Sequence, residues 1–340
     1  MLAPIVLFVY NRLDCLQRTI NSLKKNRLSR ETDLYIFSDG PKNEKDLIII
    51  NTVRNYLDTI TGFRKIERNY SSVNKGLASS IIEGVTLIIK KYGKVIVVED
   101  DLIVSSNFLD WMNQALVKFQ FENNIFSVSG FSPQINCWGY PYDSFMVRKA
   151  HCWGWGTWSD RWETVDWNIA DWNEFRLNKK NQKEFDQLGS EMSGLLFACM
   201  EGRISSWWIR FSYNQFKQNK LTVYPCQSKV INDGFTSEAT HCCVYNRYRV
   251  DFDMSGKEQF NFSFMLMENK CIARQFYSYY SVKARVLGKL KTYLMKLGII
   301  KQHSTHVPLW HPYLPYKECR QPEMHKSLYP PHPRNYHIDG

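Results

Sequence analysis

The stretch VIVVEDD at residues 95–101 places four apolar residues directly before three carboxylates. A short apolar run of this kind is typical of a buried strand. Carboxylates at the end of a buried strand are unfavourable unless a positive charge neutralises them. A hard cation, Mg²⁺ or Mn²⁺, does so when one or two carboxylates and a substrate diphosphate supply its oxygen ligands. The alternative is a solvated acidic turn that precedes the next helix.

The sequence around this stretch alternates short apolar runs with helical patterns. We expect strands at Ile5–Tyr10, Leu34–Phe37, Ile66–Tyr70 and Val95–Val98, and helices at Asp14–Lys25, Glu44–Leu57 and Lys75–Lys91. This alternation predicts an α/β fold with a mixed, mostly parallel sheet and helices on both faces. Polar motifs follow three of the strands, at residues 11–12, 39–40 and 99–101. Ligands of such sheets bind at the carboxyl ends of the strands.

The rest of the chain is expected to complete the same domain. Helices are predicted at Asn107–Phe121, Lys183–Cys199 and Ser205–Lys217, and strands at Phe126–Ser129, Phe145–Val147 and Leu221–Tyr224. We expect a catalytic domain over residues 1–250, with a nucleotide-binding half (about 1–104) and an acceptor half (about 105–250). A basic amphipathic extension (251–310) and an irregular tail rich in Pro, His and Tyr (311–340) follow.

The formal net charge of +11 favours an anionic partner. Within the extension, Val282–Ile300 combines leucines at helical spacing with Lys and Arg. This pattern fits either a helix on an anionic membrane surface or a plain surface helix. The chain has no apolar stretch of membrane-spanning length, and its nine cysteines include no C-x-x-C pair. We therefore expect reduced thiols and a cytoplasmic protein. Peripheral binding to the inner face of the cytoplasmic membrane is the further expectation if Val282–Ile300 lies on a membrane.

Three further motifs suggest contacts to a nucleotide. Asn11 and Arg12 offer an amide and a guanidinium that can pair with phosphate, or they simply precede a helix. Asp39 can accept hydrogen bonds from a base or a ribose, although Asp-Gly-Pro is also a common turn. Lys75 opens a helix, where N–H groups favour an anion.

An aromatic segment and a histidine complete the candidates. Trp155 lies in WGWGTW (153–158), where glycines between the indole rings would allow a sugar or a base to approach. The alternative is that the tryptophan rings belong to the core. His241 is a possible metal ligand or phosphate contact, although a single histidine in a loop is more often neither. The sequence contains no Walker motif and no G-x-G-x-x-G, so ATPase and dinucleotide-binding dehydrogenase functions lack support.

Six motifs occur in an order that resembles a known family: PIVLFVYNR (4–12), SDGPK (38–42), NKGL (74–77), VVEDDL (97–102), WGWGTW (153–158) and NDGFTSEATH (232–241). Together they resemble bacterial GT-A-fold sugar transferases, similar to glycosyltransferase family 2 and related to the N-acetylglucosaminyltransferase I family. The resemblance covers roughly residues 4–241.

The resemblance implies an inverting transferase that uses a UDP-sugar and Mn²⁺. Asp101 would bind the metal, and Glu99 and Asp100 would contact the ribose or support the metal's ligands. Asp39 would face the uracil ring, with Arg12 near the nucleotide, and residues 154–156 would border the donor sugar and the acceptor. The expected function is transfer of a hexosyl or N-acetylhexosaminyl group to a saccharide or lipid-linked saccharide in cell-envelope polysaccharide biosynthesis, for example lipopolysaccharide.

The chain departs from this family in one motif. The family carries its general base in a Trp-Asp-Asp-Trp segment, whereas SWWIR (206–210) here has no carboxylate. A base is still needed to deprotonate the acceptor hydroxyl. Asp160, directly after the tryptophan-rich segment, is our first candidate, and Glu201 is another, together with Asp166 and Asp171.

Two other functions remain open at this point. A sugar nucleotidyltransferase shares the α/β sheet and the cation, but it would be expected to carry a glycine-rich basic loop after the first strand, where this chain has NRLD (11–14). A nucleic-acid-binding protein is suggested only by charge and aromatic content, and the acidic triplet argues against it.

Overall fold

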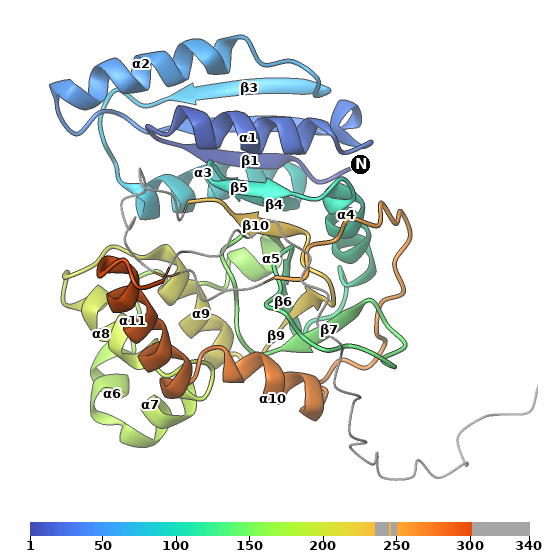
Figure 1. The fold of residues 1–340 in the computed structure, drawn as a ribbon, viewed down its shortest axis with the longest axis vertical. Helices are drawn as coiled ribbons and strands as arrows, with labels where there is room; N and C mark the ends of the chain where they lie inside the picture. The colour runs from blue at the N-terminus through green and yellow to red at the C-terminus, as the bar shows by residue number, and fades with distance from the viewer. Residues whose placement is uncertain (235–244, 246–249, 301–340) are drawn as a thin grey trace, which may run out of the picture.

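A mixed eight-stranded sheet forms the centre of the protein in the computed structural model, which describes residues 1–234, 245 and 250–300 (Figure 1). The strand order is β3-β2-β1-β4-β8-β6-β9-β7, and a separate two-stranded sheet pairs β10 with β5. The strands are β1 (Ile5–Val9), β2 (Asp33–Ser38), β3 (Lys65–Tyr70), β4 (Lys94–Glu99), β5 (Leu102–Val104), β6 (Ile125–Ser129), β7 (Ser144–Val147), β8 (Trp155–Trp158), β9 (Leu221–Pro225) and β10 (Val230–Asn232).

Strands β1 to β4 are parallel and alternate with α1 (Leu13–Lys24), α2 (Glu44–Asp58) and α3 (Leu77–Tyr92). Alternate side chains of these strands enter two separate cores. Leu7 and Val98 belong to the core beneath α1, α2 and α4 (Phe108–Lys118). Val6 and Val97 belong to the core beneath α3 and α9 (Trp207–Lys217). The mixed, mostly parallel α/β sheet with helices on both faces is therefore confirmed.

The WGWGTW segment forms β8, an antiparallel strand between β4 and β6. Gly156 lies opposite Ile96, and a Cβ at Gly156 would be only 2.8 Å from the carbonyl oxygen of Val95. Trp155 is 1% exposed and stacks on Trp207 with ring centroids 4.9 Å apart. The glycine and the indole thus serve close strand packing and the core. The strand was not predicted, because its glycines weaken the usual signal for a strand.

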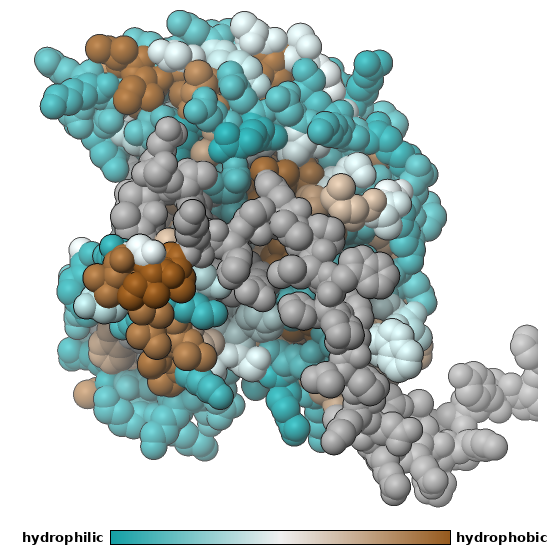
Figure 2. Space-filling view, viewed as in Figure 1, coloured by the Kyte–Doolittle hydropathy of each residue, from teal (hydrophilic) through white to brown (hydrophobic). Residues whose placement is uncertain are grey.

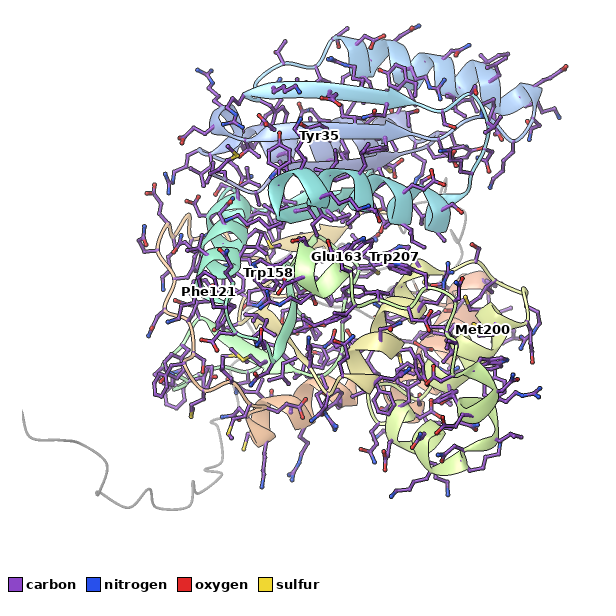
Figure 3. All side chains as sticks on the ribbon, turned by 180° about the vertical axis from the view of Figure 1, so that it is seen from behind. Tyr35, Phe121, Trp158, Glu163, Met200 and Trp207 are labelled. Atoms are coloured by element: carbon purple, nitrogen blue, oxygen red, sulfur yellow. The ribbon has the colours of Figure 1, made fainter. Side chains whose placement is uncertain are left out.

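Short helices form a lobe beside the sheet (Figure 1). They are α6 (Trp172–Leu177), α7 (Lys179–Asp186) and α8 (Met192–Met200), whereas α5 (Ser159–Trp162) packs against the sheet with Trp162 in the core beneath α3. The single helix predicted at Lys183–Cys199 is instead divided between α7 and α8. The break contains Gly189, whose backbone N–H donates to the carbonyl oxygen of Asp186. Seen from behind, the labelled Met200 of this lobe and Phe121 after α4 lie on opposite sides of the molecule (Figure 3).

The first part of the predicted extension packs onto the domain. Phe262 contacts Trp111 of α4, with ring centroids 5.0 Å apart. In α10 (Lys270–Ser278), Phe276 packs against Tyr224 of β9. Cys271 is disulfide-bonded, which corrects the expectation that all the thiols are reduced. The helix α11 (Val282–Lys296) follows, and the predicted tail at 311–340 lies outside the described residues. None of the helices in the described ranges is long and apolar enough to span a membrane.

Candidate functional site

A cavity of about 380 Å³ lies where β1, β2 and β4 end. All three strand-end motifs contribute to its wall, together with the start of α3 and the residues after β10. The lining residues are Phe8, Val9, Tyr10, Asn11, Arg12, Phe37, Asp39, Lys42, Asn74, Gly76, Leu77, Ser80, Glu99, Asp100, Asp101, Asn232 and Gly234. The structure therefore brings together Asn11, Arg12, Asp39 and the acidic triplet, as the strand-end positions predict.

Arg12 neutralises two carboxylates of the triplet. Its Nη2 lies 2.6 Å from Oδ1 of Asp100, and its Nη1 lies 3.1 Å from Oδ2 of Asp101. The Asp100 side chain is 4% exposed and that of Asp101 14%, so both charges are largely withdrawn from water. An arginine is suited to this place because its planar fork binds two acceptors and stays charged when buried.

The backbone of the first strand and helix fixes this arrangement. Phe8 pairs with Glu99 in the β1–β4 register, so the two strands end side by side. Oδ2 of Asp100 accepts a hydrogen bond from the Tyr10 backbone N–H at 3.1 Å. The Asp100 carbonyl oxygen accepts another from Oγ1 of Thr19 in α1 at 2.9 Å. Asp100 therefore holds the junction between the strands and is only partly free to bind a ligand.

The electrostatic state of the triplet follows from burial and mutual repulsion. Burial, with repulsion from Asp101 and Asp100, raises the pKa of Glu99 to about 8, and Arg12 opposes this only weakly. Burial also raises the pKa of Asp100 to about 6 against the attraction of Arg12, and it raises the pKa of Asp101 in the same sense. One arginine is thus too little positive charge for three carboxylates, and a further cation would be stabilised here.

Residues after β10 complete the acidic end of the cavity. The Asp233 N–H donates to the Asp101 carbonyl oxygen at 2.8 Å, and Gly234 N–H donates to Oδ1 of Asn232 at 2.8 Å. A Cβ at Gly234 would overlap Oδ2 of Asp101, so a larger residue here would have to displace the Asp101 carboxylate. Asp233 itself pairs with Arg18 of α1. The sequence showed this segment only as part of a motif, and the pairing of β10 with β5 brings it to the triplet.

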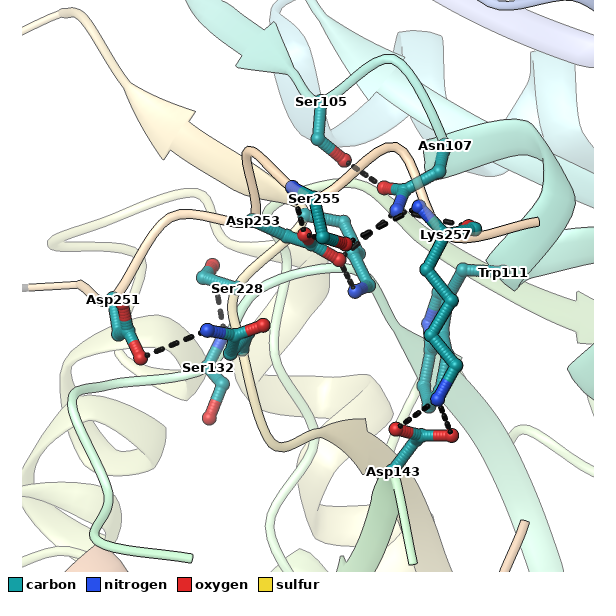
Figure 4. A network of polar contacts seen from close by, with 12 residues as sticks. Ser105, Asn107, Trp111, Ser132, Asp143, Ser228, Asp251, Asp253, Ser255 and Lys257 are labelled. Carbon is teal, nitrogen blue, oxygen red and sulfur yellow. Dashed lines mark hydrogen bonds and ion pairs between the residues drawn. The ribbon is translucent and has the colours of Figure 1, made fainter. Parts of the chain in front are cut away.

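A buried polar network supports β10 from below (Figure 4). Lys229 and Asp253 form an ion pair and are each 3% exposed. Oδ1 of Asp253 also accepts from Ser255 N–H at 2.8 Å, and Oδ2 accepts from Nδ2 of Asn107 at 3.0 Å. The backbone of Lys229 bonds to Gly130 and Ser105 on either side. The network thus ties the segment that leads into β10 to α4 and β5.

Asp39 organises the loop that opens α3. Oδ1 accepts from the backbone N–H groups of Gly40 and Lys75, both at 2.9 Å. Oδ2 accepts from Gly76 N–H at 2.9 Å and from Nδ2 of Asn74 at 3.1 Å. A carboxylate has about four acceptor positions, and these four donors fill them. Asp39 lines the cavity as predicted, but in this conformation its oxygens serve the protein. Contact with a base remains a prediction.

The start of α3 faces the cavity without a capping side chain. Gly76, the N-cap residue, has φ +78°, and its N–H is taken by Asp39. The N–H groups of the first helical turn, beginning at Leu77, remain available for an anion. Lys75 behaves differently from the prediction, since its Nζ pairs with Glu83 at 2.6 Å on the surface and its side chain is not part of the cavity wall.

Tyr10 and Lys42 form a wall that sequence reasoning missed. The Tyr10 hydroxyl donates to Oδ2 of Asp46 at 2.9 Å, and Nζ of Lys42 lies 5.4 Å from the centre of the Tyr10 ring. Both residues line the cavity. Tyr10 directly precedes Asn11, and Lys42 ends the SDGPK motif that contains Asp39. This closeness to predicted site residues was the only sign in the sequence that they line the cavity.

The acidic end has oxygen atoms free for a divalent cation. In the described ranges, both oxygens of Glu99 and Oδ1 of Asp101 accept no hydrogen bond from another residue. No set of three His, Cys, Asp or Glu side chains in those ranges converges on one metal position. Magnesium and manganese sites that use one or two carboxylates leave the other positions to phosphate and water. The free oxygens of Glu99 and Asp101 fit a cation of that type.

Besides Lys75, three predicted site residues do not line the cavity: Trp155, Asp160 and Glu201. Trp155 is buried in the core. Asp160 follows β8, whose end pairs with Lys94 at the opposite edge of the sheet from Glu99, and its exposed side chain pairs with Arg161. Glu201 ends α8 and pairs with Arg203 on the surface. His241 lies outside the described residues. The acceptor-side residues predicted from the sequence are thus not assembled with the triplet.

Comparison with known proteins finds similarity among solved structures. No family model matches the chain, and no curated protein is significantly similar to it. Among solved structures it is similar to the mannosyltransferase PcManGT of Pyrobaculum calidifontis in complex with GDP-Man and Mn²⁺ (9% identity, 46% of this chain and 44% of that chain, TM-score 0.33). It is also similar to TarS of S. aureus (16% identity, 38% of this chain and 21% of that chain, TM-score 0.26). A third similar structure is the bifunctional glycosyltransferase WbbM (11% identity, 38% of this chain and 23% of that chain, TM-score 0.24).

These neighbours are glycosyltransferases, and this chain matches less than half the length of each. The likeness is too loose to carry their donors, metals or acceptors over to this chain.

Proposed function

We propose that this chain is a glycosyltransferase that binds a nucleotide-diphosphate sugar in the cavity at the ends of β1, β2 and β4. The observation that carries the proposal is the acidic triplet beside Arg12. Both lie in a cavity of about 380 Å³ that the start of α3 also enters. Such a volume is within the range of small-ligand pockets.

The charges in the cavity suit a diphosphate with a cation. Arg12, Lys42 and the N–H groups at the start of α3 favour an anion. Glu99, Asp100 and Asp101 would repel it unless a positive ion lay between. A divalent cation held by Asp101 would supply that charge and stabilise the departing nucleoside diphosphate. In the proposal, Asn11 and Arg12 orient the nucleotide, while Glu99 and Asp100 contact the ribose or steady the cation's ligands.

The finer assignments rest on the resemblance of the motifs. They favour a UDP-linked hexosyl or N-acetylhexosaminyl donor, an inverting reaction and a saccharide or lipid-linked acceptor of the cell envelope. Asp39 enters the proposal as the residue that shapes the α3 loop beside the nucleotide, because its four hydrogen bonds hold that loop. Asp160 and Glu201 are not part of the proposal, since neither lines the cavity.

A donor screen tests the proposal. The protein is incubated with UDP-, GDP- and TDP-sugars, with Mn²⁺ or with EDTA, and with or without an envelope extract as acceptor, and nucleoside diphosphate release is measured. We expect release from one donor class, loss with EDTA and loss in Asp101→Asn. Asp160→Asn is the matched control and should retain activity. Release of pyrophosphate from a nucleoside triphosphate and a sugar phosphate would instead identify a nucleotidyltransferase.

A further inference from the structure

Helix α11 carries an apolar stripe that is open to solvent. Five residues follow one another at intervals of three or four along this face, and each is more than half exposed: Val282, Val286, Leu290, Tyr293 and Leu297. No residue of α11 is buried. Large exposed apolar patches on a soluble domain mark interaction surfaces, so this stripe requires a partner.

The charges on α11 indicate the chemistry of that partner. The helix contains Lys283, Arg285, Lys289, Lys291 and Lys296 and no acidic residue. On a helical wheel, Lys289 and Lys296 border one side of the stripe and Lys283 borders the other. Lys291 instead packs on the protein, with its Nζ 4.9 Å from the centre of the Tyr245 ring. Protein interfaces are depleted in lysine at their centre. A lipid surface accommodates lysines, because long side chains extend from an apolar face to the headgroups.

The opposite face of α11 is held by the protein. Arg285 pairs with Glu191 at 3.0 Å and donates to the Ser190 carbonyl oxygen at 3.0 Å. Oγ1 of Thr292 accepts a hydrogen bond from the Tyr245 N–H at 3.0 Å. These contacts fix the orientation of α11 on the protein. The apolar stripe therefore faces the solvent in one defined direction.

A second apolar patch lies on the same side of the molecule. Leu47, Ile48 and Ile49 at the start of α2 are 43%, 73% and 44% exposed. Figure 2 shows one apolar surface over the start of α2 and another over α11, both on the left of the view. The β3 arrow in Figure 1 also points to this side, which is the side where the parallel strands end and the cavity lies.

We propose that α11 lies on an anionic phospholipid bilayer, with its apolar stripe in the interface and its lysines at the headgroups. The start of α2 touches the same surface. This is the geometry of an interfacial amphipathic helix, whose binding combines apolar burial with attraction to anionic lipid. The proposal goes beyond the proposed glycosyl transfer and is independent of it, because lipid binding needs no sugar nucleotide.

Vesicle flotation tests the proposal. The full chain is mixed with phosphatidylcholine vesicles containing 0 or about 30 mol% phosphatidylglycerol, at low and at physiological salt. We expect binding to anionic vesicles at least tenfold stronger than to neutral ones and weakened by salt. The double variant Val286→Glu/Leu290→Glu should lose at least tenfold of this binding. Phe121→Glu is the matched control, since Phe121 is 85% exposed on the opposite side (Figure 3), and should bind as wild type does.

Three results would overturn the proposal. They are equal binding to neutral vesicles, unchanged binding by the double variant, and a concentration-dependent dimer in light scattering that the double variant abolishes. The last result would assign the stripe to a second copy of the chain. Circular dichroism and thermal unfolding establish that the double variant is folded, as expected for exposed residues.

Discussion

Arg12 and Asp100 form an ion pair that joins the ends of two neighbouring strands, with Nη2 of the arginine 2.6 Å from Oδ1 of the aspartate. The same guanidinium reaches Asp101 at 3.1 Å. A single positive side chain therefore compensates two of the three carboxylates in the protein itself. Any cation or substrate that enters the cavity must share these carboxylates with Arg12.

Removal of Arg12 should destabilise the protein and make it sensitive to divalent cations. In Arg12→Met the carboxylates of Asp100 and Asp101 lose their partner, at a cost of about 3 kcal/mol in the free energy of unfolding. Urea denaturation at pH 7 measures this cost. Mn²⁺ should raise the melting temperature of the variant more than that of wild type. Arg30→Met, an exposed arginine without an ion pair in the described ranges, is the control. A variant as stable as wild type would contradict the role of Arg12.

The unfolding free energy should depend on pH through Glu99 and Asp100. Their folded-state pKa values, about 8 and about 6, lie above the ordinary values of 4.5 and 3.8. The native state therefore binds more protons than the unfolded state between about pH 4 and pH 8, and stability falls as pH rises through this window. Burial raises the pKa of Asp253, but the ion pair with Lys229 outweighs burial and lowers this pKa to about 2. Asp253 therefore affects the unfolding free energy only at lower pH.

Denaturation at pH 5, 6, 7 and 8 measures this dependence. Glu99→Gln removes one of the two groups, so its stability should decline less steeply with pH than that of wild type. Parallel curves for wild type and Glu99→Gln would show that Glu99 does not titrate in this range.

Asp39→Asn should loosen the loop before α3. In asparagine one carboxylate oxygen is replaced by an NH₂ group, which cannot accept a hydrogen bond. The two donors that this oxygen satisfies in wild type, for example Gly76 N–H and Nδ2 of Asn74, would then lose their acceptor. We expect a loss of about 2 kcal/mol in stability and faster hydrogen exchange at Lys75 and Gly76. Asp14→Asn, an exposed aspartate of α1 whose side chain accepts no hydrogen bond in the described ranges, is the control. Unchanged exchange with a weaker affinity for nucleotide would instead indicate that Asp39 contacts the base directly.

Gly156→Ala tests whether the WGWGTW segment is structural. A Cβ at this position would lie 2.8 Å from the Val95 carbonyl oxygen, so β4 and β8 would have to separate. The expected cost is about 2 kcal/mol. Gly194→Ala in α8 is the matched control, because no atom lies within 4 Å of its Cβ and the site is helical. That change should stabilise the protein by up to about 1 kcal/mol. Equal effects of the two changes would contradict the packing described here.

The Lys229–Asp253 pair should be strongly coupled. Asp253→Asn or Lys229→Met leaves a buried partner without its counter-charge, and each should cost about 3–5 kcal/mol. The double variant should lose less unfolding free energy than the two single variants together, because it leaves no buried charge without a partner. A double-mutant cycle by urea denaturation measures the coupling, with Asp251→Asn as control. Additive losses would show that the two residues act separately.

The N-terminal part of the sheet, β1 to β4 with its helices, was predictable because its signals are local. Apolar runs and helical patterns placed β1 to β4 and α1 to α3 within a few residues. The rule that ligands bind at strand ends then brought Arg12, Asp39 and the triplet to one edge. These residues meet because parallel strands end together, so no long-range information was needed.

The rest depended on contacts between distant segments. Trp155 looked available to a sugar, but its strand is inserted between β4 and β6, and the insertion buries the indole. The same register sends Asp160 to the far edge of the sheet. Gly234 meets Asp101 only because β10 pairs with β5. The pairing of β8 with its neighbours and the pairing of β10 with β5 leave no periodic pattern in the sequence, so neither could be predicted from it.

The most direct test of the account is the binding of UDP and GDP, measured by titration calorimetry with Mn²⁺ present or chelated, in wild type and Asp101→Asn. We predict that one nucleotide binds wild type with Mn²⁺, and that chelation and Asp101→Asn each weaken this binding at least tenfold, a change of about 1.4 kcal/mol. Binding that is the same without Mn²⁺ and in Asp101→Asn would contradict the claim that the acidic triplet holds a cation and a nucleoside diphosphate.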